Sequence, residues 1–229
     1  MSGVPSLDGA RRDLVAFGRR MAHDGLATLT AGNLSCRVGD LVAVTPRGVD
    51  YERTEPAHIC IVDLDGRPVD AALGPSSELP MHLTVYRLTG AGAVVHTHSP
   101  FATALGTVVD DLPPVHYLVA LLGGPVRVAP YATPGSDELA EHMGTALEGR
   151  SAVLLGNHGA ITIGDTLEQA YGRALLLEWL CGVYYRARLL GEPRLLAGDE
   201  IAKVGGLLEH YLQDPPGGGP RPTARPPTP

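Results

Sequence analysis

The sequence predicts an α/β protein of the α+β type, built around a central, mainly antiparallel sheet. The chain has 229 residues, of which 44% are hydrophobic and 19% charged, and this suffices for one sizeable domain with a full core. Short apolar segments at 41–45 and 59–63 follow each other without a long helix between them, which favours antiparallel pairing. A long and strongly apolar helical segment, 167–190, adds helix to the second half of the chain.

The first helix is expected over residues 8–24, because Leu14 and Met21 recur there at helical spacing. Asp8 is its expected cap and Gly25 its expected end. Three strand segments are then expected, over 28–37, where a turn feeds the strand, and over 41–45 and 59–63, the last followed by a hairpin turn at 65–67.

The remaining chain alternates helices and strands. Ser136 is the expected cap of one helix, and Asp165 or Thr166 that of the long apolar one. Helices are expected over 78–88, 100–105, 116–122, 137–147, 167–190 and 199–212, and strands over 93–98, 126–128, 151–155 and 160–163. The tail 213–229 is rich in proline and glycine without an apolar pattern, so we expect it to be disordered.

Composition excludes several classes of partner. The net charge of −7 argues against nucleic acid and against an anionic membrane surface. No apolar run reaches 18 residues, and the first six residues lack the apolar core of a signal peptide. The three cysteines, Cys36, Cys60 and Cys181, are scattered and odd in number, which fits small apolar residues in a reducing cytoplasm.

Two histidines alternate along one predicted strand. Side chains two residues apart in a strand point to the same face, so His96 and His98 project together. Adjacent imidazoles suit a divalent transition metal such as zinc. His158, which follows the apolar run 153–155, is the third candidate ligand, and Glu78 is the natural fourth. The alternative is that these are surface histidines, or core histidines with satisfied hydrogen bonds.

Two turns offer candidate anion sites. Gly32 can take positive φ, and the backbone N–H groups there together with the Asn33 amide suit a phosphate. An ordinary Gly-Asn turn explains the same residues and is favoured on these residues alone. Ser76 and Ser77 open the helix expected over 78–88, where free N–H groups and partial positive charge attract anions. A plain serine cap is the alternative there.

Taken together, these segments resemble the class II aldolase/adducin family, and most of all its L-fuculose-1-phosphate aldolase branch. The resemblance spans roughly residues 10–212, so that 1–212 is expected to be one catalytic domain with a three-layer αβα fold. It rests on Ala-Gly-Asn-Leu-Ser at 31–35, Pro-Ser-Ser-Glu at 75–78, His-Thr-His at 96–98, Leu-Pro-Pro-Val-His-Tyr at 112–117, Ala-Pro-Tyr-Ala-Thr at 129–133 and Asn-His-Gly at 157–159.

The resemblance implies a zinc-dependent lyase, although another divalent metal is possible. Its substrate would be L-fuculose 1-phosphate or a related deoxy-sugar phosphate, cleaved to dihydroxyacetone phosphate and an aldehyde. Glu78 would shuttle the proton at C3 once displaced from the metal. Tyr117, reaching in from a neighbouring subunit, would protonate the aldehyde oxygen in condensation and help remove the C4 hydroxyl proton in cleavage. Tyr211 is a weaker candidate for closing the site. The implied assembly is a homo-oligomer, most simply a tetramer.

The resemblance also gathers a phosphate site from the turns. The residue before Gly48 is usually Ser or Thr in these proteins, and here it is Arg47, which strengthens phosphate binding, points away, or signals a different anionic group. The expected phosphate residues are Gly32, Asn33, Arg47, Gly48, Ser76 and Ser77.

Three alternatives stay open at this point. An L-ribulose-5-phosphate 4-epimerase uses the same metal and the same retro-aldol step, and a decarboxylase of phosphorylated sugar acids is a second relative. The run 115–117, Val-His-Tyr, favours the aldolase branch over the epimerase. A catalytically inactive, adducin-like interaction module is the third alternative, and the presence of all four expected ligands argues against it.

Overall fold

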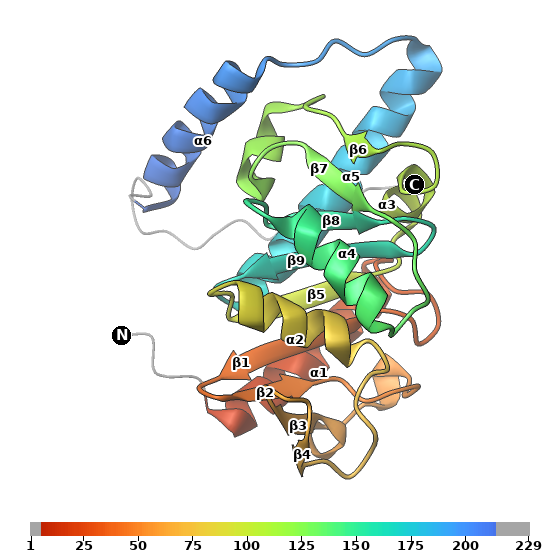
Figure 1. Ribbon diagram of the computed structural model, residues 1–229, viewed down its shortest axis with the longest axis vertical. Helices are drawn as coiled ribbons and strands as arrows, with labels where there is room; N and C mark the ends of the chain where they lie inside the picture. The colour runs from red at the N-terminus through yellow and green to blue at the C-terminus, as the bar shows by residue number, and fades with distance from the viewer. Residues whose placement is uncertain (1–5, 214–229) are drawn as a thin grey trace.

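The structure, a computed structural model, describes residues 6–213, with side chains described as far as residue 208 (Figure 1). The tail 214–229 and the Tyr211 side chain lie outside the described residues, so the predictions made for them stay predictions. Among the described residues, none of the helices is both long enough and apolar enough to cross a membrane.

One central sheet runs through the molecule. Its strand order is β4-β3-β2-β1-β5-β9-β8-β7-β6, and each neighbouring pair is antiparallel except β7 and β8. The mainly antiparallel sheet expected from the sequence is therefore confirmed. The strands are β1 (Asn33–Val38), β2 (Leu41–Val44), β3 (Cys60–Asp63), β4 (Pro68–Asp70), β5 (Ala93–Thr97), β6 (Asp111–Leu112), β7 (Val126–Ala129), β8 (Ala152–Leu155) and β9 (Gly159–Gly164).

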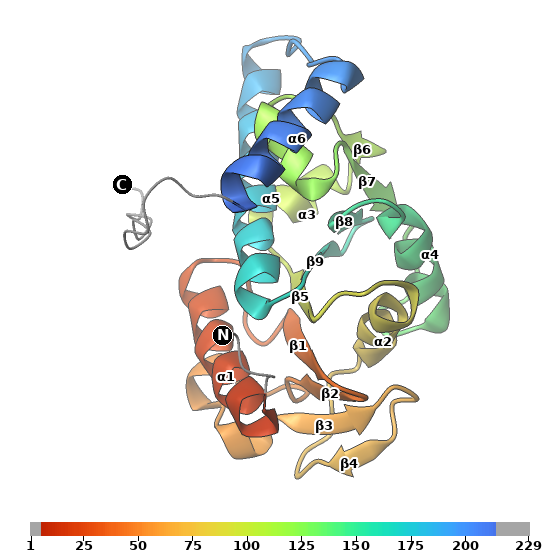
Figure 2. The same cartoon turned by 90° about the vertical axis from the view of Figure 1, so that its left-hand side faces the viewer.

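Helices cover both faces of the sheet, so the fold has three layers (Figure 2). One face packs on α2 (Leu79–Leu88) and α4 (Asp137–Leu147), and the other face on α1 (Leu7–His23), α3 (Pro100–Leu105) and α5 (Leu167–Leu190). The 3-10 helix η3 (Tyr117–Leu122) and α6 (Gly198–Gln213) pack together beside the second face. Two further 3-10 turns, Tyr51–Arg53 and Pro56–His58, follow β2.

The single parallel pair has a simple topological cause. Antiparallel neighbours can be joined by short turns, but parallel neighbours need a long crossover. The chain leaves β7, forms α4 on one face of the sheet, and returns as β8 in the same direction.

Several local details differ from the sequence-based expectation. The cap of α1 is Ser6, whose hydroxyl accepts from the Gly9 N–H at 3.1 Å, rather than Asp8. The segment expected as a helix at 116–122 is a 3-10 helix that ends at Gly123, with φ of 87°. Thr166, the second of two expected caps, is the one that caps α5. His82, which lies on α2, is fully buried.

Candidate active site

The site lies at the centre of the sheet, where β5 and β9 pair. His96 stands in β5 opposite Ile161 of β9, and His158 lies in the turn that leads into β9. Gly159 makes this arrangement possible, because a Cβ at that position would lie 2.1 Å from the Thr97 carbonyl oxygen. His98 follows directly after β5. The strand alternation expected for the pair at 96 and 98 therefore holds across the end of the strand.

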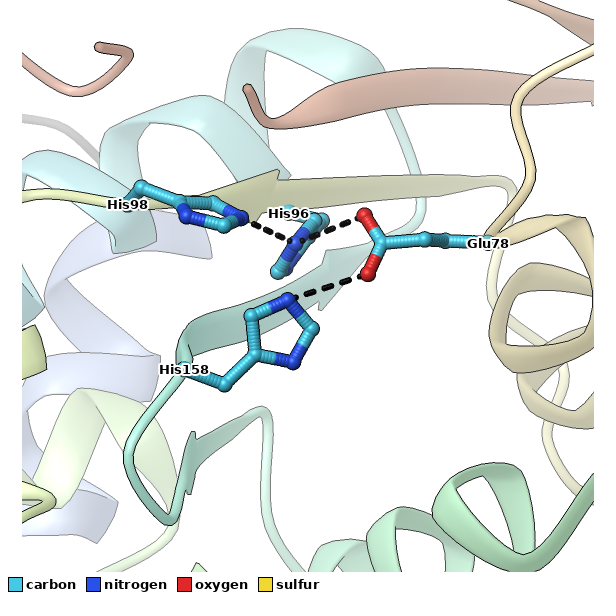
Figure 3. Close-up of side chains that lie close together, drawn as sticks. All are labelled: Glu78, His96, His98 and His158. Carbon is cyan, nitrogen blue, oxygen red and sulfur yellow. Dashed lines mark hydrogen bonds and ion pairs between the residues drawn. The ribbon is translucent and has the colours of Figure 1, made fainter. Parts of the chain in front are cut away.

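The three imidazoles converge on one point (Figure 3). Their ring centroids are 4.8 Å apart for His96 and His98, and 4.9 Å apart for each of the two pairs with His158. The Nε2 atoms of His96 and His98 lie 2.9 Å from each other. Neutral imidazoles are the form that binds a divalent metal.

Glu78 faces the imidazoles from the N-cap position of α2. Its Oε2 lies 3.0 Å from His96 Nε2, and its Oε1 lies 3.0 Å from His158 Nε2 (Figure 3). Oε2 also accepts a 2.8 Å hydrogen bond from the side-chain amide of Asn33, which stands opposite His96 on β1. One ligand atom from each of the four residues Glu78, His96, His98 and His158 lies within 4.8 Å of the others.

A hydrogen bond on the far side of the His96 ring leaves its convergent nitrogen free. His96 Nδ1 lies 2.9 Å from the Ala160 carbonyl oxygen, which can only accept, so the proton sits on Nδ1 and Nε2 keeps its lone pair. This is the arrangement by which a backbone carbonyl usually orients a metal-binding histidine. The buried Nδ1 of His158 has no hydrogen-bond partner among the described residues.

The electrostatics of the cluster also suit a cation. Burial, together with the neighbouring His96 and His158, lowers the pKa of His98 to about 4, so its ring is neutral near pH 7. Burial alone would raise the pKa of Glu78, but His96 and His158 outweigh it and hold that pKa well below its usual range. Glu78 is therefore a carboxylate near neutral pH, and it places one negative charge beside the ring nitrogens of His96 and His158.

A pocket of about 320 Å³ opens in front of this group. All six residues expected to bind phosphate line it, beside Glu78, His98 and His158. Sequence reasoning missed four others, Thr30, Ala31, Pro46 and Pro134, because a turn residue or a proline carries no signal of the cavity it borders. The complete lining is Thr30, Ala31, Gly32, Asn33, Pro46, Arg47, Gly48, Ser76, Ser77, Glu78, His98, Pro134 and His158.

The loop that carries Ser76 and Ser77, called the serine loop below, is held in this pocket by backbone contacts. Pro46 and Pro75 form a β-bridge, and the Ser76 N–H donates to the Thr45 carbonyl at 3.1 Å. On the other side Gly135, with φ of 81°, lies so close to Ser77 that a Cβ would sit 2.6 Å from the Ser77 carbonyl oxygen. Segments far apart in sequence therefore fix the loop that leads into Glu78.

Tyr117, the expected second catalytic residue, is placed elsewhere. It lies at the start of η3 with 45% of its surface exposed, and it is absent from the pocket lining formed by the described residues. Its ring stacks on His116 at 4.5 Å between centroids, and His116 in turn meets the edge of Trp179 at 4.9 Å. Within one chain the structure does not bring Tyr117 to Glu78.

Comparison with known proteins places this geometry in a family. Residues 12–185 match the class II aldolase and adducin N-terminal domain. A 5-deoxy-D-ribulose 1-phosphate aldolase of Bacillus thuringiensis serovar kurstaki is 40% identical over 210 residues, which cover 90% of this chain and 99% of that protein. A 5-methylthioribulose-1-phosphate/5-deoxyribulose-1-phosphate aldolase of Rhodospirillum rubrum is 39% identical over 196 residues, covering 85% of this chain and 88% of the relative.

A solved structure agrees with the sequence matches. An L-fuculose 1-phosphate aldolase superposes with a TM-score of 0.86 at 35% sequence identity, over 91% of this chain and all of that one. The residues matched by the family and by this structure include the central sheet and the residues of the site. The chain thus belongs to the class II aldolase and adducin family, as one of its aldolase members.

Proposed function

We propose that this aldolase uses zinc and reversibly cleaves the C3–C4 bond of a ketose 1-phosphate, forming dihydroxyacetone phosphate and an aldehyde. One observation carries the proposal: a single pocket is lined both by Glu78, His98 and His158 and by the turns that suit a phosphate. A substrate with a phosphate on C1 and a ketone on C2 has these two groups a few bonds apart, so both can enter the same pocket.

The donor set fits a divalent metal, and zinc before the others. Three neutral imidazoles with a carboxylate are ligands that zinc takes readily, and His96, His98 and His158 would hold it through Nε2 with Glu78 alongside. When bound, such an ion supplies a Lewis acid that polarises a ketone. Among the described residues, Glu78 Oε1 and His158 Nδ1 are buried atoms without a hydrogen-bond partner, and Oε1 lies 3.0 Å from the Nε2 of His158.

Glu78 is the residue we propose for the proton at C3. Its low pKa keeps it deprotonated near pH 7, as a base needs in the condensation direction. In cleavage the same carboxyl would return the proton to C3. The Asn33 amide on Oε2 limits the rotation of the carboxylate, so its other oxygen stays directed at the group of imidazoles.

The substrate phosphate would bind where the serine loop and the 32–33 turn meet. Gly32 has φ of 85°, a conformation that turns the backbone N–H groups of this turn outward. Ser76 and Ser77 add hydroxyl groups just before α2. Arg47 lines the same pocket with an exposed side chain, and we propose that its positive charge complements the phosphate.

A 5-deoxypentulose 1-phosphate is the substrate we put first. Two relatives at 40% and 39% identity carry names with such a substrate. Cleavage between C3 and C4 would leave C1–C3 as dihydroxyacetone phosphate and C4–C5 as acetaldehyde. L-fuculose 1-phosphate is the second candidate, supported by the superposition with the fuculose enzyme. The two candidates share the phosphate half and differ in the aldehyde.

A panel of sugar phosphates tests this proposal. The zinc-loaded protein is incubated with 5-deoxy-D-ribulose 1-phosphate, 5-methylthioribulose 1-phosphate, L-fuculose 1-phosphate and, as the epimerase control, L-ribulose 5-phosphate. We expect dihydroxyacetone phosphate from the 1-phosphates, fastest from a 5-deoxypentulose, and no change in the 5-phosphate. Epimerisation of the 5-phosphate without release of dihydroxyacetone phosphate would contradict the proposal.

We further propose that Tyr117 acts from a neighbouring subunit of a homo-oligomer. The ring is exposed beside other exposed apolar side chains, as a residue at a subunit boundary would be. From there it would protonate the aldehyde oxygen in condensation and accept the C4 hydroxyl proton in cleavage. Sites that lie between subunits would then need the assembly, most simply a tetramer.

A further inference from the structure

A buried row of polar side chains leads from Glu78 into the interior. Asn33 touches Glu78 through its amide nitrogen, at 2.8 Å, and His82 through its amide oxygen. The other ring nitrogen of His82, Nδ1, lies 2.7 Å from the Ser35 hydroxyl, which lies 2.6 Å from the Tyr86 hydroxyl. None of the four residues beyond Glu78 is more than 5% exposed. The proposed function uses Asn33 alone of these four.

The hydrogen bonds in this row all point the same way. A carboxylate only accepts, so Asn33 must present its N–H groups to Glu78 and its oxygen to His82. That oxygen also only accepts, so His82 carries its proton on Nε2. Burial keeps the ring neutral by lowering its pKa to about 3, and Nδ1 is then an acceptor for the Ser35 hydroxyl. The oxygen of Ser35 in turn accepts from Tyr86.

The direction of the row decides which end of the Asn33 amide faces the pocket. In the observed orientation one N–H binds Glu78 and the second is free for the pocket that Asn33 lines. In the flipped orientation the amide oxygen would face the Glu78 carboxylate and the incoming phosphate, both negatively charged. An amide flip alone would therefore turn two attractive contacts into repulsive ones. His82 is the donor that excludes this flip.

We propose that His82 is a positioning residue, which locks the Asn33 amide with its N–H groups toward Glu78 and the substrate phosphate. The hydroxyl groups of Ser35 and Tyr86 continue the row behind His82 and satisfy the Nδ1 of this tautomer. This inference rests on the proposed function for the meaning of the Glu78 and phosphate contacts. The row itself is a feature of the chain and does not depend on the substrate.

Substitutions at position 82 test the role in catalysis. His82→Leu removes the donor, and we expect kcat/KM to fall about 10- to 100-fold while zinc per chain stays at the wild-type level, the scale seen when a partner of a site residue is lost. His82→Gln keeps an N–H near the place of Nε2, and we expect it to stay within about threefold of wild type. His23→Leu, the same change at an exposed ring, is the control. Equal losses in the Leu and Gln variants would overturn the proposal.

A double-mutant cycle separates positioning from general damage to the core. If His82 acts through Asn33, then His82→Leu should lower the kcat/KM of an Asn33→Ala protein less than about threefold, because no amide remains to be held. If the two losses multiply instead, His82 does not act through Asn33 and the proposal fails. Melting temperatures of all four proteins show that each variant is folded at the assay temperature.

The tautomer gives a readout that needs no substrate. We would record the ring nitrogen NMR signals of metal-free protein labelled with ¹⁵N-histidine, and assign His82 by its absence in His82→Gln. We expect a neutral ring protonated on Nε2, whereas a ring protonated on Nδ1 or on both nitrogens would overturn the proposal. A wild-type protein that releases no dihydroxyacetone phosphate would refute the proposed function, and this spectrum would still decide the direction of the row.

Discussion

The proposed function gives Glu78 two roles at one position, and the two roles can be separated. As a neighbour of the imidazoles it adds a negative charge to a metal site, and as an acid or base it must gain and lose a proton. Three imidazoles already suffice to hold zinc, and water fills a fourth position readily. An amide of the same size keeps an oxygen toward the metal but cannot carry the proton.

We therefore predict that Glu78→Gln keeps near-wild-type zinc content but loses turnover about 100-fold or more, the usual scale for one proton-transfer group. Zinc per chain and the rate of dihydroxyacetone phosphate release would both be measured. Retention of most of the activity would assign the proton transfer to another residue.

His96→Ala should behave differently from Glu78→Gln. His96 is the ring at the centre of the group, within 3.0 Å of both His98 and Glu78, and it is completely buried. With only two imidazoles left, we expect the variant to lose both zinc and activity. Added zinc that restores full activity at stoichiometric concentration would show that His96 is not needed for binding. The pair of variants thus separates metal binding from proton transfer.

His82 also predicts how stability depends on pH. Burial, and next to it the charge of His96, lowers the pKa of His82 from 6.5 to about 3, although Glu78 acts in the opposite direction. Below about pH 6.5 the unfolded chain binds a proton at this ring and the folded protein does not, so the free energy of unfolding falls as the pH falls.

In metal-free protein we expect this residue to remove about 1–2 kcal/mol of unfolding free energy between about pH 6.5 and pH 5. Denaturant unfolding of wild type and of His82→Gln at a series of pH values measures it. The variant should show the smaller loss, because glutamine does not titrate. Parallel curves for the two proteins would mean that His82 does not stay neutral in the folded state.

At the scale of single residues, the grouping of the three histidines could be predicted from the sequence. The buried hydrogen bonds of His82 behind them could not. Alternation along a strand places His96 beside His98, and apolar runs mark the strands that carry them and His158. The burial of His82 left no such mark, because its neighbours Asn33 and Ser35 are distant in sequence and only pairing of β1 beside α2 brings them together. The cap at Ser6 was missed because both Ser6 and Asp8 are good capping residues.

At the scale of elements, the active-site loops depend on contacts between distant segments. The loop before α2 is held by a bridge to Pro46 on one side and by the segment before α4 on the other. Gly135 allows the second contact, because it has positive φ and no Cβ to meet the Ser77 carbonyl. A glycine in a loop looks the same in sequence whether it is free or tightly packed, so this support could not be foreseen.

We predict that Gly135→Ala displaces the serine loop. The added Cβ and the positive φ should together cost about 1–3 kcal/mol of unfolding free energy. Because Ser77 lines the pocket, KM for the ketose 1-phosphate should rise more than kcat falls. Gly74→Ala is a matched control near the start of the same loop, since a Cβ there meets nothing within 4 Å. Similar effects from both variants would contradict the proposed contact.

The order of elements was largely predictable, and the exceptions have physical causes. Hydrophobic periodicity identified α1, α5 and the longer strands but not the short β4 and β6, and short connections predicted antiparallel pairing. The parallel neighbours β7 and β8 follow from the crossover through α4, which a count of apolar segments does not reveal. The segment Tyr117–Leu122 was expected as a helix and takes the tighter 3-10 form, which is common in short segments, before Gly123 ends it with positive φ.

At the scale of the whole molecule, one side presents apolar groups to solvent. Large apolar side chains that are 48–92% exposed lie on the C-terminal half of α5 and the segment after it, together with α6: Trp179, Tyr185, Leu189, Leu190, Leu195 and Leu207. Isolated exposed leucines are common, but such a series on neighbouring elements is typical of a surface that binds another protein. A second copy of the chain is the partner we propose, consistent with the expected homo-oligomer.

The last prediction tests whether the site lies between subunits. Glu78→Gln and Tyr117→Phe should each be inactive alone. The first variant loses a carboxylate that lines the pocket, and the second loses the hydroxyl of an exposed ring that does not line it. If Tyr117 comes from a neighbouring subunit, a site with both native residues forms whenever a Tyr117→Phe chain receives the tyrosine of a Glu78→Gln chain. Unfolding, mixing in equal amounts and refolding should then restore about one site in four in a closed ring. Rates are compared with each variant refolded alone and with wild type treated identically, and light scattering measures the assembly. If the mixture is no more active than its components although mixed oligomers form, Tyr117 does not act across a subunit boundary.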